Sequence, residues 1–80
     1  MPRFYVHFRN GDFLAKDEEG EDFSGLDEAE AAAIISGREI LAGDVKSNAT
    51  NPLTEIVITG EDGTELVTIS ANDLLPGLLK

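Results

Sequence analysis

Apolar and polar positions alternate along residues 3–9, as expected for a strand with one buried face. The side expected to face a core carries Phe4, Val6 and Phe8. The opposite side carries Tyr5, His7 and Arg9. Asn10-Gly11 is typical of a tight turn because both residues tolerate positive φ, and residues 13–16 predict a short return strand. The first element is therefore predicted to be a β-hairpin.

Small and apolar side chains then recur at helical spacing and predict one helix. The stripe consists of Leu26, Ala29, Ala33, Ile34, Gly37, Ile40, Leu41 and Val45. Ser24 with Asp27, or Asp27 with Glu30, resembles a capping box at its start, and either Gly43 or Ser47-Asn48 ends it. Glycine costs a helix about 1 kcal/mol relative to alanine, so we expect Gly37 to serve close packing on a sheet.

Two further strands are predicted at residues 54–60 and 64–70, joined by a turn at residues 61–63. Ser70 and Asp73 are suited to cap one short helical turn before Pro76-Gly77. The order hairpin, helix, hairpin predicts an α+β domain, with the helix packed on one face of a small, mainly antiparallel sheet. We expect a single domain over residues 1–80, with a compact body (1–70) and a leucine-rich tail (71–80).

Charge and composition narrow the functional classes. The 80 residues carry 16 acidic and 6 basic side chains, a formal net charge of −10, and no cysteine. Such a surface repels nucleic acid and anionic membranes, and the lack of cysteine excludes disulfides, thiolate zinc sites and a cysteine nucleophile. We see no signal-peptide pattern and no apolar run of membrane-spanning length, so a cytoplasmic location is expected. The acidity serves solubility or a basic protein partner.

The one histidine, His7, and the acidic segment "DEEGEDFSG" (17–25) are the candidates for chemistry. A general base needs a nucleophile and an orienting acid, and neither is evident near His7, so a polar cross-strand pair is the favoured interpretation. The acidic segment has no EF-hand spacing and is predicted to be a solvated loop that Phe23 anchors. Weak binding of a cation or small ligand by this loop and His7 remains the alternative. We assign no catalytic, cofactor or metal residues and expect no enzyme.

The opening "MPRFYVHFRNGDFLAKDEEGEDFSGLDEAEAAA" resembles a family of short bacterial domains of unknown function. The matching positions are Pro2, Arg3, Tyr5, His7, Gly11, Asp17, Glu18, Gly20, Leu26, Ala29, Ala33, Leu41, Asp62 and Gly63. The resemblance extends to about residue 70, and its specific part is the first 20 residues. It implies a compact hairpin–helix–hairpin domain and no known activity. The tail "LLPGLLK" departs from the family's pattern.

One helix covers only one face of a sheet, so the other face is expected to be open. Whichever face of the second hairpin turns inward, apolar side chains remain outside, and the tail leucines must cover their own core or a neighbouring subunit. The candidate interface residues are Tyr5, His7, Arg9, Val57, Leu66, Leu74, Leu75, Leu78 and Leu79. We therefore predict a non-enzymatic interaction module that self-associates or binds a protein through the open face, a sheet edge or the tail.

Overall fold

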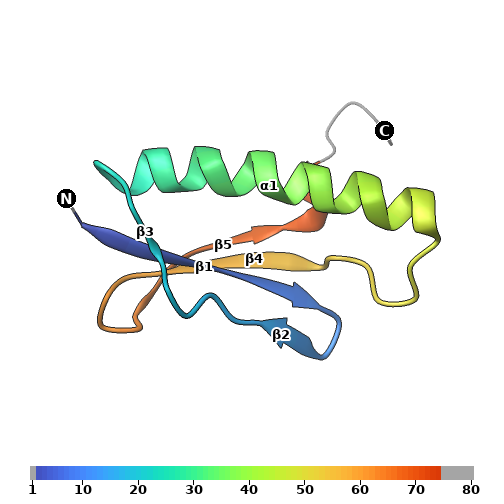
Figure 1. The fold of residues 1–80 in the computed structure, drawn as a ribbon, viewed down its shortest axis with the longest axis horizontal. Helices are drawn as coiled ribbons and strands as arrows, with labels where there is room; N and C mark the ends of the chain where they lie inside the picture. The colour runs from blue at the N-terminus through green and yellow to red at the C-terminus, as the bar shows by residue number, and fades with distance from the viewer. Residues whose placement is uncertain (1, 75–80) are drawn as a thin grey trace.

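The computed structural model describes residues 2–74 and contains one α-helix beside an antiparallel sheet (Figure 1). The α+β class is thereby confirmed. The elements in chain order are β1 (Arg3–Asn10), β2 (Phe13–Ala15), β3 (Glu21–Asp22), α1 (Leu26–Ser47), β4 (Glu55–Thr59), β5 (Glu65–Ser70) and the 3₁₀ turn η1 (Ala71–Leu74).

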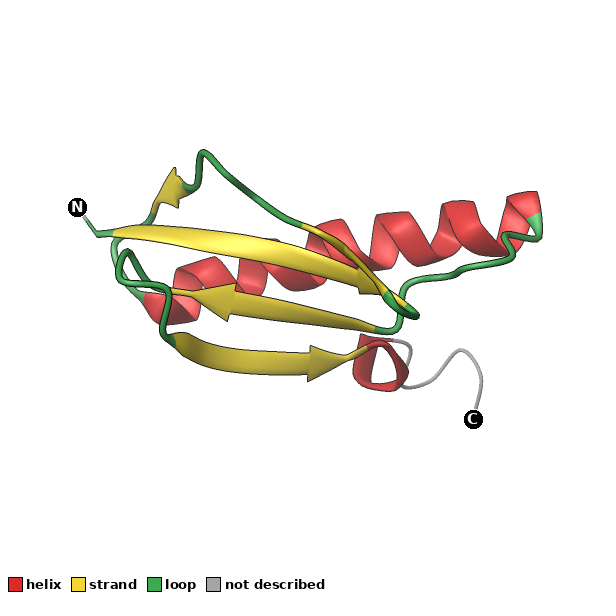
Figure 2. Cartoon of the chain, turned by 90° about the horizontal axis from the view of Figure 1, so that it is seen from below, coloured by secondary structure: helices red, strands yellow, loops and turns green. Residues whose placement is uncertain are grey.

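Strand β1 organises the sheet. The strand order is β2-β1-β4-β5, and the two-residue strand β3 pairs with the same edge of β1 as β2 does, nearer its beginning (Figure 2). Each pairing is antiparallel. β2 pairs with Phe8–Asn10 and β3 with Arg3–Phe4, so the middle of β1 lies between two short neighbours on this edge.

Helix α1 runs along one face of the sheet, and the core lies between the two layers (Figure 1). Ile56 and Ile58 of β4 are fully buried at its centre. The other buried members of this core are Phe4, Ala29, Ala33, Leu41, Leu53 and Leu74. Val6 and Phe8 are partly buried against it, so the side of β1 predicted to face the core does so.

The ends of α1 differ in part from the sequence prediction. Gly25 is the N-cap, and within residues 2–74 no side chain forms a cap hydrogen bond, so neither predicted capping box, Ser24 with Asp27 or Asp27 with Glu30, forms. The helix ends at Ser47, the later of the two predicted sites, where Asn48 adopts a left-handed conformation with φ 53°. Val45 is 74% exposed, because the last turns of the helix extend past the sheet (Figure 1).

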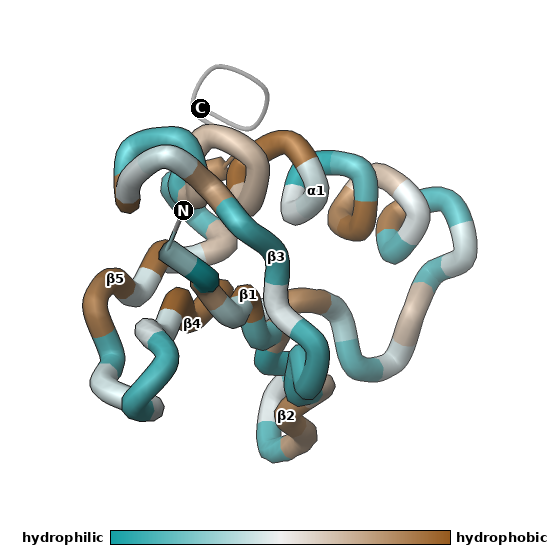
Figure 3. The backbone as a smooth tube through the Cα atoms, turned by 60° about the vertical axis from the view of Figure 1, so that its left-hand side comes forward, coloured by the Kyte–Doolittle hydropathy of each residue, from teal (hydrophilic) through white to brown (hydrophobic). Residues whose placement is uncertain are grey.

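The acidic segment also differs from the prediction of a simple loop. Glu21 and Asp22 form β3, and Figure 3 shows that the chain around this strand is hydrophilic. Phe23 anchors the segment as predicted, with its ring centroid 6.2 Å from that of Phe4. A strand forms here because β1 offers unpaired backbone groups, a long-range cause that the local charge pattern does not reveal.

Close packing of α1 depends on Gly37. A Cβ atom at this position would lie 2.6 Å from Cδ1 of Ile56 and 2.8 Å from Cδ1 of Leu74. Both side chains are essentially without exposure, so they have little room to move. Gly43 lies about 1.7 turns further along the helix, and a Cβ there meets no atom of the described residues within 4 Å.

We therefore expect Gly37→Ala and Gly43→Ala to change stability in opposite directions. Gly43→Ala should raise the free energy of unfolding by about 0.5–1 kcal/mol, because alanine is the better helix former. Gly37→Ala should lower it by about 1 kcal/mol or more, because overpacking outweighs the same gain. Urea unfolding followed by circular dichroism measures both, and a stabilised Gly37→Ala variant would show that this contact does not limit the packing.

Candidate functional site

The sheet face opposite α1 carries the side chains predicted to form an open surface. Strand register places Tyr5 beside Thr59, His7 beside Val57 and Arg9 beside Glu55. Residues directly opposite in an antiparallel pair share a face, so these six side chains lie on one side of the sheet. Figure 2 views the sheet from this side, with α1 behind it.

This face is less open than predicted. His7 is only 7% exposed and Val57 only 5%, so the prediction that both are exposed is wrong. Val57 lies on a strand with neighbours on both sides, and residues 16–18 approach His7 from beyond β2. Covering a sheet face therefore does not require a second helix, since a loop and adjacent side chains suffice.

The other predicted residues of this face differ in exposure. Tyr5 and Arg9 are partly buried, and Nε of Arg9 lies 2.9 Å from Oε1 of Glu55 in a half-exposed ion pair. Leu66 is 43% exposed at the irregularity where β5 shifts register against β4. Their role in an interface stays a prediction.

Both ring nitrogens of His7 form hydrogen bonds. The backbone N–H of Asp17 donates to Nδ1 at 2.9 Å, so this nitrogen carries no proton. In the neutral ring the proton is then on Nε2, which lies 3.1 Å from Oγ1 of Thr59 and donates to it. His7 is thus the polar partner of Thr59 on the neighbouring strand, and it ties the loop after β2 to the sheet.

The carboxylate of Asp17 replaces a missing strand at the edge of β1. Oδ2 accepts the N–H of Val6 at 3.1 Å, in the stretch of β1 that lies between β2 and β3. Oδ1 accepts the N–H groups of Gly20 at 3.0 Å and Glu19 at 3.3 Å. We call residues 17–20, held by this carboxylate, the Asp17 loop.

These hydrogen bonds set the acidity of Asp17. Partial burial acts to raise its pKa, but hydrogen bonds from the N–H groups of Gly20, Val6 and Glu19 outweigh burial. The pKa of Asp17 is therefore lowered from its ordinary value of 3.8. The carboxylate is part of the folded architecture, and its acceptor positions face the backbone.

Arg3 and Gly20 hold the far end of the Asp17 loop. The Arg3 guanidinium donates to the carbonyl of Glu19 at 2.8 Å and to Oδ1 of Asp22 at 3.1 Å. Gly20 has φ +71°, and a Cβ there would lie 2.8 Å from Cε2 of Tyr5. The loop therefore rests directly on the first residues of β1.

Residues 2–74 contain neither a candidate metal site nor a candidate membrane-spanning helix. Within that range no three His, Cys, Asp or Glu side chains are grouped so that they could hold a metal ion. No helix in the same range is long and apolar enough to cross a membrane.

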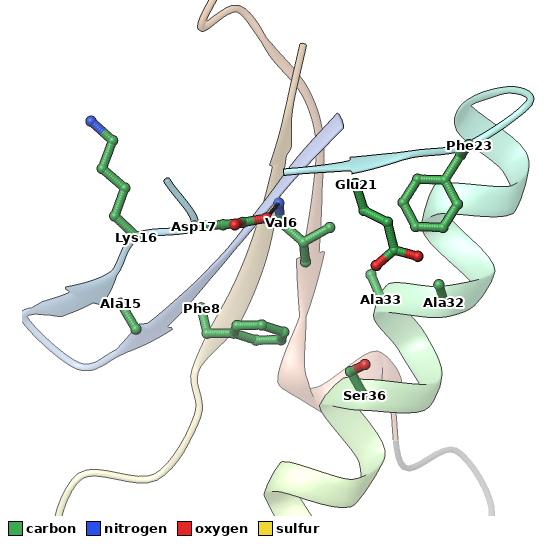
Figure 4. Close-up of a pocket in the computed structure, with 10 residues that line it drawn as sticks. All are labelled: Val6, Phe8, Ala15, Lys16, Asp17, Glu21, Phe23, Ala32, Ala33 and Ser36. Atoms are coloured by element: carbon green, nitrogen blue, oxygen red, sulfur yellow. Dashed lines mark hydrogen bonds between the residues drawn. The ribbon is translucent and has the colours of Figure 1, made fainter. Parts of the chain in front are cut away.

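A groove of about 390 Å³ opens on the α1 side of the sheet, between the helix and the edge at β2 (Figure 4). Its walls are mainly apolar, from Val6, Phe8 and Ala15 on the strands to Ala33 on the helix. Lys16, Asp17, Glu21, Phe23, Ala32 and Ser36 complete the lining. The groove exists because α1 lies over β1 and β4, whereas its alanine side chains leave the space toward β2 unfilled.

Strand β2 presents the clearest exposed apolar surface of the sheet. Phe13 is 67% exposed and Leu14 is 38% exposed, and all three residues of the strand are accessible. Leu14 shares the face of Arg9, whereas Ala15, and with it Phe13, shares the α1 face of Phe8. Among residues 2–74, β2 therefore has no strand on its outer edge and carries an apolar side chain on each face.

The tail residues separate into two groups. Leu74 is 2% exposed and belongs to the core, so it covers the chain's own interior, one of the two alternatives predicted for the tail. Its carbonyl accepts a hydrogen bond from Nε of Arg38 at 3.0 Å. Leu75, Leu78 and Leu79 lie outside the described residues.

The sequence prediction missed Phe13, Leu14 and Thr59 as residues of interest, and it did not anticipate that Asp17 holds the edge of β1. One signal was available for the first two, since consecutive apolar residues in a strand must point to opposite faces and cannot both be buried under one helix. No local signal reveals the roles of Asp17 and Thr59. They depend on which strands pair with β1.

Comparison with known protein families places the chain in a family. The family described as "Domain of unknown function (DUF6894)" matches residues 3–72, which confirms the inferred resemblance to a family of domains of unknown function. No curated protein and no solved structure matches the chain.

Asp17→Asn is expected to destabilise the fold by about 1–2 kcal/mol at neutral pH, because the amide keeps one acceptor oxygen for three N–H donors. The effect should depend on pH. A lowered folded-state pKa contributes stability above the unfolded value of 3.8 and loses it as pH falls through the folded value. The difference between wild type and variant should therefore shrink below about pH 4.

Chemical unfolding of both proteins between neutral pH and about pH 2.5 measures this difference. Hydrogen bonds to Thr64 also lower the pKa of Asp62, so wild type alone does not isolate Asp17. The Asp62 contribution cancels when the variant is subtracted. A difference that stays constant down to the lowest pH would contradict this role for the Asp17 carboxylate.

Gly20→Ala should cost more stability than Gly63→Ala. Both glycines have positive φ, +71° and +84°, so alanine is strained at each by about 1–2 kcal/mol. At Gly20 the methyl would also lie 3.0 Å from the Phe4 carbonyl oxygen, whereas at Gly63 it meets no atom of residues 2–74 within 4 Å. We expect Gly20→Ala to be worse by at least about 1 kcal/mol. Equal thermal shifts would show that the Asp17 loop tolerates displacement.

Proposed function

The chain belongs to the DUF6894 family of domains of unknown function, and we propose that it is a small acidic, non-enzymatic interaction module that binds a protein chain along the β2 edge of its sheet. In this proposal the hairpin–helix–hairpin body is a scaffold whose helix stabilises one face. The observation that carries it is the exposure of Phe13 and Leu14 on a strand whose outer edge pairs with no other strand of residues 2–74.

An exposed strand edge is a binding template, because its N–H and C=O groups can pair with an added strand. Main-chain hydrogen bonds supply affinity in this mode, and alternate side chains supply specificity by entering neighbouring pockets. β2 combines both elements, because it has an open backbone edge and lies beside the groove that Ala15 and Phe8 line (Figure 4).

The opposite edge of the sheet is less suited to pairing. β5 shifts register beside Ile58 and Thr59, and such irregularities twist an edge away from regular pairing. The exposed residues of β5 include Glu65, Thr68 and Ser70. Aromatic anchors are enriched at interfaces, and Phe13 on β2 is of this type.

Replacing both apolar side chains by threonine (Phe13→Thr with Leu14→Thr) should abolish association while leaving the fold intact. Threonine keeps strand propensity, and the exposed positions should change the free energy of unfolding by less than about 1 kcal/mol. Val45→Thr is the matched control. It makes an exposed apolar side chain on the helix polar while nearly keeping its shape, and Val45 is 74% exposed.

Light scattering of the purified chain, and affinity capture from extract of its own organism, would each be performed on the three proteins. We expect the wild type and Val45→Thr to form an oligomer or capture a protein, and we expect the double variant to do neither. A wild-type chain that stays monomeric and captures nothing would refute the proposal, as would association that the double variant keeps.

A further inference from the structure

We infer that the occupant of the β2 edge is a second copy of this chain, paired antiparallel so that Leu14 lies opposite Leu14 of the second copy. This inference rests on the proposed function and names its partner. The pairing is symmetric about a two-fold axis, in which each copy presents the same surface to the other.

The backbone of β2 has the correct phase for this pairing. The N–H of Val6 points toward the β2 side of β1, since it donates to Asp17, whereas the Arg9 carbonyl points toward β4 and accepts the N–H of Thr54. Alternation along β1 then makes Phe8–Ala15 and Asn10–Phe13 the hydrogen-bonded pairs of the hairpin. The N–H and C=O of Leu14 consequently point outward, where two copies can exchange them.

The side chains around Leu14 are self-complementary in this register. The segment reads Asp12-Phe13-Leu14-Ala15-Lys16, so antiparallel pairing about Leu14 places Asp12 opposite Lys16 and Phe13 opposite Ala15. By symmetry the dimer has two Asp12–Lys16 pairs of opposite charge and two Phe13–Ala15 pairs of a large and a small side chain. Asp12 and Lys16 are exposed, and neither takes part in the two ion pairs formed within residues 2–74.

The groove in Figure 4 explains why a phenylalanine fits opposite an alanine. Residues opposite each other share a face, so Phe13 of the second copy lies on the α1 side next to Ala15, which lines the groove. Phe8 and Val6 form the apolar wall beyond Ala15. The pairing therefore gives a 67% exposed ring an apolar surface in each copy.

Net charge opposes any dimer of this chain, because each copy carries −10. At about 0.15 M salt the screening length is near 8 Å, so distant carboxylates contribute little and the Asp12–Lys16 contacts at the interface decide the register. Asp12→Lys makes each chain less negative. If general charge repulsion controlled association, this variant would dimerise more strongly than wild type. We expect it to dimerise more weakly, because it places like charges together at the interface.

The test compares dimer dissociation by sedimentation velocity at about 0.15 M salt for the wild type and charge variants. Asp12→Lys alone and Lys16→Asp alone each create two like-charge contacts, and each should weaken the dimer by about tenfold or more. The double variant restores opposite charges and should dimerise like wild type. Glu39→Lys, an exposed helix position with the same charge change as Asp12→Lys, should not weaken it.

Mixing the two single variants provides the strictest measurement. Asp12→Lys brings two lysines to the edge and Lys16→Asp brings two aspartates, so native mass spectrometry should detect the mixed dimer in preference to either homodimer. Circular dichroism checks that each variant is folded. Equal dissociation constants for Asp12→Lys and Glu39→Lys, or no preference for the mixed dimer, would overturn this register.

A wild-type chain that stays monomeric would overturn the inference of a dimer. The capture experiment then decides whether the proposed function stands. If such a monomer captures another protein through Phe13 and Leu14, the edge binds a different partner. If it captures nothing, both proposals fail. The threonine double variant could lose dimerisation while the charge variants leave it unchanged. That result would support the β2 edge as the interface and reject the pairing about Leu14.

Discussion

The fold depends on the way β1 is completed along its outer edge. Two short strands, β2 and β3, cover its ends, and the gap between them would leave backbone donors unpaired in a partly buried position. Asp17 closes this gap with its carboxylate on Val6 and its own N–H on His7. One residue thereby joins the loop to β1 and, through His7 and Thr59, to β4. The acidity of the segment around it then has a structural component as well as a role in solubility.

This arrangement gives the family resemblance a physical basis. The specific part of the resemblance includes Arg3, Tyr5, His7, Asp17 and Gly20, which are scattered in the sequence. In the structure they form one unit, because Arg3 holds the Asp17 loop, Gly20 rests against Tyr5, and His7 accepts the Asp17 N–H. A histidine between aromatic residues suggests chemistry when it is considered alone. Its two hydrogen bonds assign it a structural function.

Much of the architecture could be predicted because its causes are local. Alternation in β1, the Asn10-Gly11 turn and the spacing of Ala29 and Ala33 determine strand, turn and helix over a few residues. The candidate site could be predicted less well, because exposure depends on contacts between distant segments. Val57 is buried by its neighbouring strands, and β3 forms only because β1 has a free edge, so neither outcome appears in a local pattern.

The Asp17 loop also determines where the sheet can accept another strand. It covers the stretch of β1 beyond β2, so the outer edge available on this side is reduced to the segment around Leu14. A short edge limits uncontrolled association between chains. It also means that the few side chains beside it determine which strand can pair there. On a surface dominated by carboxylates, Lys16 follows directly after β2 and supplies the opposite charge on which the proposed pairing depends. The loop that stabilises the monomer thus also confines the proposed pairing to the short segment around Leu14.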